Sequence, residues 1–332
     1  MKRLILGGLL FGLLLPFFFI FYRLFAFHTF PFDSYYEYVL ALDGRLPISV
    51  IDAPGGYRIG YYGPAFWCYK YMPAIPLSKL EGTSDPAQIK ALQALAFTSY
   101  LYLCSFVITL YYWIRKQTRA GAREAAGFSA LILLWTFYAY PYGVDALYFF
   151  YMTLTLLACS QPRWWAILLL ISPFFNEKIA LVWLMYSGLM WLTAPFNKAR
   201  YLPLIGSTAA LGGYFIIRNV VQLPVGLYGY QTDLSQFWTR IQLSLPVLIS
   251  FKGFYTNWMP PLLLTAMSWV AWRQSNWDSG NQWLHPVIAI LPWALFITGM
   301  FVSSDYGIGR LAMHALPFFV LLIWKNTEAL LE

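Results

Sequence analysis

The chain has 332 residues, of which 60% are hydrophobic and only 11% are charged, and its formal net charge is +8. This composition excludes an ordinary soluble globular protein and predicts an integral membrane protein. The 15 Trp and 25 Tyr residues fit many bilayer interfaces, where amphipathic rings settle. The basic excess follows the loops and does not form a patch with base-stacking aromatics, so we exclude nucleic acid as a partner.

The N-terminus begins with Met1, Lys2 and Arg3, followed by an apolar run from Leu4 to about Phe25. This charge pattern is typical of a signal peptide. However, the run is too long for the apolar region of a signal peptide, and no cleavage site of small residues follows it. We therefore expect an uncleaved membrane anchor.

A short acidic stretch with Asp33, Ser34 and Glu37 follows this anchor. If a helix begins near Ser34, Asp33 lies at its N-terminus and Glu37 one turn further along the same face. Ser34 and Glu37 match a capping box, which accounts for Glu37 but not for Asp33. Because an acidic residue beside lipid is costly unless it has a role, Asp33 is the best single candidate for chemistry. Capping and chemistry both remain open for this stretch.

The first outer loop, residues 28–90, is long and only partly polar. Its stretch from Tyr57 to Trp67 indicates an aromatic turn, in which Arg58 would stack on rings or hold an anion. An interfacial helix over Pro64–Leu80 is expected to follow this turn.

Apolar runs long enough, or nearly long enough, to span a bilayer recur along the rest of the chain. With the N-terminal run they predict an all-α, polytopic membrane protein with about ten transmembrane helices. Several runs are shorter than the roughly 20 residues of a straight span, so they would need burial among neighbours or a thinned bilayer. The runs lie near Leu92–Ile114, Ala125–Tyr140, Ala146–Cys159, Trp164–Phe174, Ile179–Ala194, Leu202–Ile217, Phe254–Trp272, Leu284–Val302 and Leu311–Trp324.

The basic residues fix the expected orientation. If Lys2 and Arg3 are inside, the inner loops carry 11 basic and 4 acidic residues and the outer loops 11 basic and 10 acidic residues, as the positive-inside rule expects. We therefore expect a multi-pass protein of the inner (plasma) membrane with a cytoplasmic N-terminus. Residues 1–332 would form a single transmembrane domain, with a second outer loop over residues 218–252.

Several charged residues gather on the predicted outer side. Glu177 and Lys178 open a helix after a proline turn, either as an interfacial pair or as a polar cluster facing a cavity. Asp145 would cap the next helix or belong to the site. Asp305 and Arg310 would form a turn salt bridge or bind a ligand; we favour the ligand, because Arg suits bidentate phosphate binding. The three His residues have no spacing that would indicate a metal.

Taken together, these motifs resemble the GT-C superfamily of integral membrane glycosyltransferases. The resemblance rests on many helices with one outward-facing site, the long first outer loop and four short motifs. These are Phe32-Asp33-Ser34-Tyr35-Tyr36-Glu37, the turn from Tyr57-Arg58 to Pro64, the helix start Asn176-Glu177-Lys178, and the ending Asp305…Arg310…Pro317. The chain departs from the family in lacking a second clear Asp-x-Asp motif.

The resemblance implies transfer of a sugar from a polyprenyl-phosphate carrier to a lipid, glycan or protein acceptor on the outer face. Inverting transfer needs a carboxylate to deprotonate the acceptor and a cation to hold the leaving phosphate. Asp33 would be the base and Glu37 would orient it, and both would hold Mg²⁺ or Mn²⁺ if a divalent cation takes part. The expected substrate-binding residues are Tyr57, Arg58, Glu177, Lys178, Asp305 and Arg310.

Two alternatives belong to other classes of protein. A transporter or flippase for a lipid-linked or anionic substrate would have charges spread through the membrane depth, broken helices and an internal repeat. The sequence indicates none of the three. A non-catalytic membrane scaffold would use Asp33 only as a helix cap.

Overall fold

The computed structural model of the chain consists of helices joined by turns and short irregular segments in the part that it describes. The described residues are 14, 16, 17, 20, 35–51, 55–77, 80, 83–118, 120–136, 144–193, 201–223, 237–274, 284–302 and 308–320. Within them the only pairing of β type is a single bridge between Leu80 and Thr83. The predicted all-α class is therefore confirmed for these residues. The expected N-terminal anchor lies almost entirely outside them.

The chain divides into two compact units. The first comprises Met1–Leu133, Pro141–Ile179 and Ala209–Gly229, and the second comprises Leu134–Tyr140, Ala180–Thr208 and Tyr230–Glu332. The predicted single transmembrane domain is not tested by this division and stays a prediction.

The first unit is built on the long helix α4 (Pro86–Gln117), whose two ends are marked in the sequence. The Asp85 carboxylate accepts a hydrogen bond from the Ala87 amide at 3.0 Å and caps the first turn. Pro86 occupies the first helical position, which suits its fixed φ. Arg115 and Lys116 complement the dipole in the last turn.

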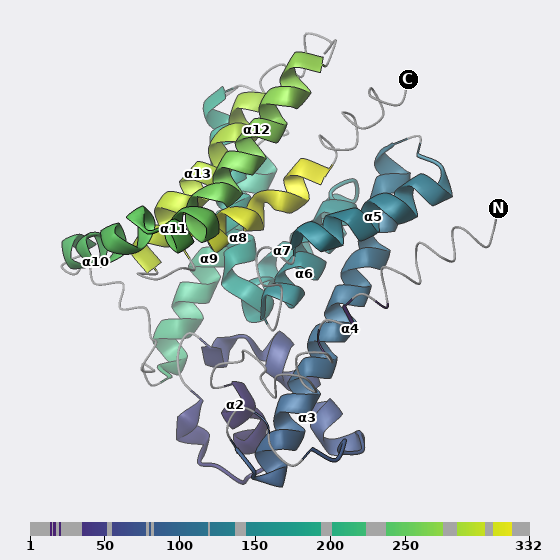
Figure 1. The fold of residues 1–332 in the computed structure, drawn as a ribbon, viewed down its shortest axis with the longest axis vertical. Coiled ribbons are helices and arrows are strands. Elements are labelled where there is room, and N and C mark those ends of the chain that lie inside the picture. The colour runs from purple at the N-terminus through teal and green to yellow at the C-terminus, as the bar shows by residue number, and fades with distance from the viewer. Residues whose placement is uncertain are drawn as a thin grey trace. The chain divides into compact units, whose positions relative to one another are not determined.

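Five further helices of the first unit accompany α4. Figure 1 shows α2 and α3 beside one end of α4 and α5 beside the other. The inner face of α4 packs mainly against α6, α3 and α2. Their bounds are α2 Tyr35–Leu42, α3 Ile59–Tyr71, α5 Ala122–Thr136, α6 Val144–Ala158 and α7 Pro162–Ile171.

Helix α3 corrects the bounds predicted for the interfacial helix. It begins at Ile59 rather than Pro64 and ends at Tyr71 rather than Leu80. Pro64 has no N–H, so the Gly60 carbonyl one turn earlier loses its helical donor. The Tyr102 hydroxyl of α4 donates to that carbonyl instead. This hydrogen bond from α4 allows Pro64 to lie inside α3. Because its donor is distant in the sequence, the local pattern around Pro64 could not predict it.

Two described helices are long and apolar enough to cross a membrane, namely α4 and α9 (Tyr201–Val221). A third candidate is α7 together with α8 (Pro173–Thr193), which are bent by 116° where they meet. The described residues thus contain fewer clear spans than the ten expected. Shorter apolar helices cover other predicted spans, at Asp145–Ala158, Ala289–Met300 and Leu311–Val320.

Helices near the C-terminal end of the chain make up most of the second unit. Helix α13 has the bounds that the apolar run predicted, and α10 shows that the segment 218–252 contains a helix. Within this unit the Asn257 side chain accepts a hydrogen bond from the Gly309 amide at 2.9 Å. The elements are α10 Phe237–Ile249, α11 Phe251–Gly253, the π-helix η7 Phe254–Trp258, α12 Met259–Gln274, α13 Leu284–Val302 and η8 Gly309–Ala315.

Candidate functional site

A break in helix α8 places two charged side chains inside the first unit. Asn176 is extended, with φ −163° and ψ 115°, so the helix is interrupted there and resumes at Glu177. The Asn176 side chain accepts a hydrogen bond from the Lys178 amide at 3.1 Å, which is the geometry of an N-cap. The predicted helix start at Asn176-Glu177-Lys178 is therefore confirmed.

The first outer loop supplies the partner of Glu177. The Arg58 guanidinium donates to both carboxylate oxygens of Glu177, with its Nε 2.8 Å from one oxygen. These residues are 119 positions apart in the sequence. Only 11% of the Arg58 side chain and 22% of the Glu177 side chain are exposed. A bidentate pair of this kind fixes both groups in one geometry.

Tyr35 completes the coordination of Arg58. Its hydroxyl accepts a hydrogen bond from the guanidinium at 2.8 Å, and its ring packs edge-on against Tyr61 at 5.2 Å. Gly60 permits this arrangement, because a Cβ at that position would overlap the ring of Phe175 just before the α8 break. The acidic stretch, the aromatic turn and the α8 break therefore meet at one place.

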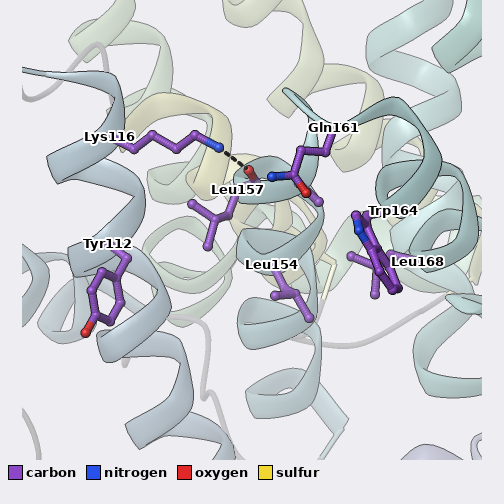
Figure 2. A pocket seen from close by; sticks show the side chains of 8 residues that line it. Tyr112, Lys116, Leu154, Leu157, Gln161, Trp164 and Leu168 are labelled. Atoms are coloured by element: carbon purple, nitrogen blue, oxygen red, sulfur yellow. Dashed lines mark hydrogen bonds between the residues drawn. The ribbon is translucent and has the colours of Figure 1, made fainter.

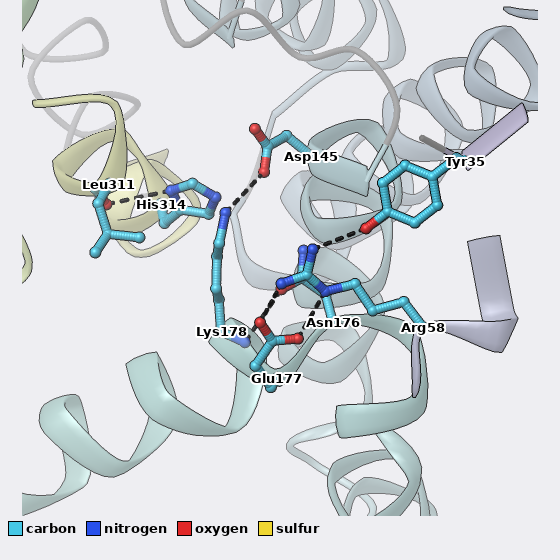
Figure 3. A network of polar contacts seen from close by, with 8 residues as sticks. All are labelled: Tyr35, Arg58, Asp145, Asn176, Glu177, Lys178, Leu311 and His314. Carbon is cyan, nitrogen blue, oxygen red and sulfur yellow. Dashed lines mark hydrogen bonds and ion pairs between the residues drawn. The ribbon is translucent and has the colours of Figure 1, made fainter. Parts of the chain in front are cut away.

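A second ion pair lies beside the first. The Lys178 ammonium is 3.2 Å from the Asp145 carboxylate on α6. Asp145 is 1% exposed, whereas a quarter of the Lys178 side chain is exposed. Figure 3 shows Lys178 pointing toward Asp145 and Arg58 pointing toward Glu177. We call Tyr35, Arg58, Asp145, Asn176, Glu177 and Lys178 the buried charge cluster.

The electrostatics of this cluster keep Arg58 charged. Burial alone would lower the pKa of Arg58, but attraction to Glu177 and the hydrogen bonds to Glu177 and Tyr35 raise it well above its ordinary value. The guanidinium donates to three acceptor atoms, so its donors are largely used within the cluster. Arg58 therefore positions Glu177 rather than offering a free fork to an anion.

Tyr214 on α9 carries a polar group near the buried charge cluster. It is 4% exposed, and its hydroxyl is buried without a hydrogen bond among the described residues. The hydroxyl lies within electrostatic range of Glu177 and Arg58. Burying a hydroxyl without a partner costs about 1–3 kcal/mol, so this group is available to a ligand.

Tyr57 joins the aromatic turn to α9. Its hydroxyl donates to the Arg218 carbonyl at 3.2 Å and accepts from the Leu223 amide at 3.3 Å. Its ring packs edge-on against Tyr214 at 5.8 Å. Because the hydroxyl of Tyr57 is already engaged in this way, we assign Tyr57 to positioning Tyr214 rather than to direct contact with a substrate.

The described contacts of this cluster do not include the remaining predicted site residues. Asp33 and Asp305 lie outside the described residues, and Arg310 is described only as a backbone position in η8. Glu37 is half-buried in the first turn of α2, where its carboxylate accepts a hydrogen bond from the Tyr36 hydroxyl at 3.2 Å. Among the predicted residues, the structure brings together Tyr57, Arg58, Glu177 and Lys178.

The described residues do not make up a site for a divalent cation. In the described ranges no three His, Cys, Asp or Glu side chains gather closely enough to hold a metal ion. Glu37 would need a second carboxylate, and the expected one, Asp33, is outside these ranges.

Tyr214 was not among the site residues predicted from the sequence, and Asp145 was expected either as a helix cap or as a site residue. Tyr214 stands in an apolar run, where a tyrosine is typical of a membrane interface. Asp145 immediately precedes an apolar run, so a helix cap explained it equally well. Only the contact with Lys178 separates these two readings of Asp145.

Comparisons with protein-family models, with curated proteins and with solved structures find no match, so the chain is assigned to no family on that basis.

Proposed function

We propose that the chain is a polytopic membrane glycosyltransferase that moves a sugar from a polyprenyl-phosphate carrier to a lipid, glycan or protein acceptor on the outer face of the plasma membrane. The observation that carries this proposal is the buried charge cluster at the α8 break. A chain with only 11% charged residues places two ion pairs side by side in the interior of an apolar helical unit. Ionisable groups in such surroundings are costly and mark sites of function.

The position of the buried charge cluster, measured along the axis of α4, supports a site near one membrane face. The Tyr61 hydroxyl lies 3.1 Å from that of Ser99 on α4 and marks the level of α3, which follows Arg58 directly. Lys116 stands 17 residues further along α4, a rise of about 25 Å. If Lys116 lies at the cytoplasmic boundary, the cluster lies near the far side of an apolar core about 30 Å thick.

The contacts suggest a division of roles. A quarter of the Lys178 side chain is exposed beside the Asp145 carboxylate, so we assign Lys178 to the leaving phosphate. Arg310 would share this charge as a planar fork. Arg58 would hold Glu177 and Tyr35 in position, and the free hydroxyl of Tyr214 would donate to an oxygen of the donor.

Asp33 remains the proposed base, two residues before Tyr35 in the sequence. It would take the proton of the acceptor hydroxyl as the acceptor oxygen bonds to the anomeric carbon. The bond from that carbon to the carrier phosphate breaks in the same step, and the phosphate leaves as an anion beside Lys178. Inversion at the anomeric carbon follows from this single displacement.

The finer topology belongs to the same proposal. With the short apolar helices counted as spans, about ten crossings and a cytoplasmic N-terminus satisfy the positive-inside rule. A reporter fused after Arg119 should then report the cytoplasm, and reporters near Asp85 or Asp233 the outside. A cytoplasmic signal at Asp233 would break the common outer face of the proposed site.

A transfer assay separates a base from a helix cap at Asp33. Candidate polyprenyl-phosphate sugars are offered to membranes that contain the protein. Asparagine caps a helix as well as aspartate but accepts no proton, so Asp33→Asn should lower the rate about 10²–10⁴-fold and leave thermal stability unchanged. Glu37→Gln is the matched control and should lose less. An Asp33→Asn variant as fast as the wild type would remove Asp33 from the mechanism.

One observation favours a transporter or flippase as the second candidate. Helices α7 and α8 are broken and bent by 116° next to the charges, and discontinuous helices at a charged site are typical of transporters. Proteoliposomes that contain the protein and a fluorescent polyprenyl-phosphate sugar distinguish the two functions. Movement of the lipid across the bilayer without change of its sugar would favour the flippase.

A further inference from the structure

A groove opens at the other end of the first unit, away from the buried charge cluster. Its volume is about 610 Å³, and it is lined by parts of α4, α6 and α7. Figure 2 shows Tyr112 and Lys116 of α4 on one side and Trp164 and Leu168 of α7 on the other. The complete lining is Tyr112, Lys116, Leu154, Leu157, Ala158, Gln161, Trp164 and Leu168.

The wall of the groove is apolar where α6 and α7 form it. Leucine, alanine and tryptophan side chains make up most of that wall. Helix α7 also exposes large apolar side chains, with Trp164 62% exposed and Ile167 and Leu170 each 49% exposed. Exposed apolar surface of this extent suits acyl chains and does not suit water.

The opening of the groove carries positive charge. Lys116 lines it, Arg115 precedes Lys116 in the last turn of α4, and Arg163 lies in the first turn of α7 next to Trp164. All three side chains are exposed. Tyr112 and Trp164 supply the amphipathic rings that settle at the level of lipid headgroups.

Lys116 retains a donor for a ligand. Its ammonium donates to the Ser160 hydroxyl at 2.5 Å and to the Leu157 carbonyl at 3.3 Å, which caps the end of α6. A lysine has three donors, and the contacts of the described residues use two of them. The third is free to meet an anionic oxygen at the opening of the groove.

We propose that this groove binds an anionic phospholipid of the cytoplasmic leaflet, with acyl chains along α6 and α7 and the headgroup phosphate on Lys116. The basic opening selects negative charge, and the apolar wall selects lipid over a soluble anion. This inference rests on insertion of the chain in a membrane and not on glycosyl transfer, because the groove and the buried charge cluster share no residue. Along α6 the nearest lining residue, Leu154, lies nine residues beyond Asp145, a rise of about 14 Å.

Native mass spectrometry of the whole protein tests the site directly. The protein is purified in detergent, equilibrated with equal amounts of phosphatidylglycerol and phosphatidylcholine, and the ratio of retained lipids is measured. The wild type should retain phosphatidylglycerol preferentially. Lys116→Gln should lower this preference about fivefold, as expected for one basic residue near a lipid surface. Arg45→Gln, which removes an exposed cation elsewhere, should leave the preference unchanged.

A second variant tests the apolar wall. Ala158→Phe places a ring in the groove and should reduce retention of both lipids, while the ratio between them changes little. An unchanged lipid ratio in Lys116→Gln, or an equal loss in Arg45→Gln, would overturn the site. Displacement of phosphatidylglycerol from the wild type by polyprenyl phosphate would also overturn it, because the groove would then belong to the carrier.

Discussion

Two groups of charged residues in the first unit use the same chemistry but differ in how far their cations are exposed. In the buried charge cluster, the side chains of Arg58 and Glu177 are 11% and 22% exposed. In the surface charge cluster, defined by Asp43, Arg45 and Lys70, the two basic side chains are 59% and 46% exposed around an Asp43 carboxylate that is 8% exposed. The surface pairs join residues at or next to the ends of α2 and α3, whereas Arg58 and Glu177 in the buried charge cluster are 119 positions apart in the sequence.

Exposed and buried ion pairs differ in how much they contribute to the free energy of unfolding. Exposed pairs contribute about 0–1 kcal/mol, because water and salt screen them. A buried pair must overcome the loss of hydration of both ions, and an apolar replacement of both partners is often neutral or stabilising. Stability therefore does not explain why the chain keeps the buried charge cluster, and we attribute it to the proposed site.

Breaking the buried pair on one side should produce the largest effect. Glu177→Gln removes the charge that balances Arg58 and leaves a guanidinium in the interior. The expected loss is about 3–5 kcal/mol of unfolding free energy. Denaturant or thermal unfolding of the purified protein in detergent measures it. A loss below about 1 kcal/mol would mean that the pair behaves like the surface charge cluster.

A substitution that displaces the start of α3 next to Arg58 should cause the next largest loss of unfolding free energy. Gly60→Ala places a methyl group against the Phe175 ring and should cost about 1–3 kcal/mol through overpacking. The matched control is Gly63→Ala in the same helix, where the nearest atom is the Ile59 Cγ1 at 3.6 Å. That change should be neutral or slightly stabilising, since Ala is a better helix former. Equal effects of the two substitutions would disprove the close approach.

The surface charge cluster should respond least, and only at low pH. The hydrogen bond from Lys70, followed by that from Arg45, lowers the pKa of Asp43. A lowered pKa in the folded state stabilises the fold fully above the unfolded value of about 4, and this contribution is lost as the pH falls through the folded value. Asp43→Asn should therefore cost less than about 1 kcal/mol at pH 7 and nothing near pH 2. Unfolding midpoints of both proteins against pH test this, and a difference that grows on acidification would contradict it.

Much of the helical fold could be predicted from apolar periodicity and local caps. The bounds of α13 agree with its apolar run, and the restart of α8 at Glu177 follows from a proline and an Asn N-cap in one short stretch. Helix α3 could not be bounded in this way, because a hydroxyl from α4 replaces the hydrogen bond that Pro64 removes. A pattern that is local in the sequence does not show a hydrogen-bond donor that lies 42 positions away.

The site was predictable only in part for a similar reason. Arg58 and Glu177 each appeared as a charged residue in an aromatic or apolar setting, but nothing local indicates that they pair across 119 positions. The separate runs predicted the break before Glu177, but not the bend of 116° between α7 and α8 beside the charges. Tyr214 became informative only through its buried and unpartnered hydroxyl.

The most direct test of the central claim replaces both members of the buried pair at once. Arg58→Met with Glu177→Met removes the charges and keeps apolar volume, so the midpoint of unfolding should match or exceed that of the wild type. The same double variant should lose sugar transfer at least about 10²-fold, because the positioned charges of the site are gone. A double variant that is stable and transfers sugar at the wild-type rate would show that the buried charge cluster is not the site.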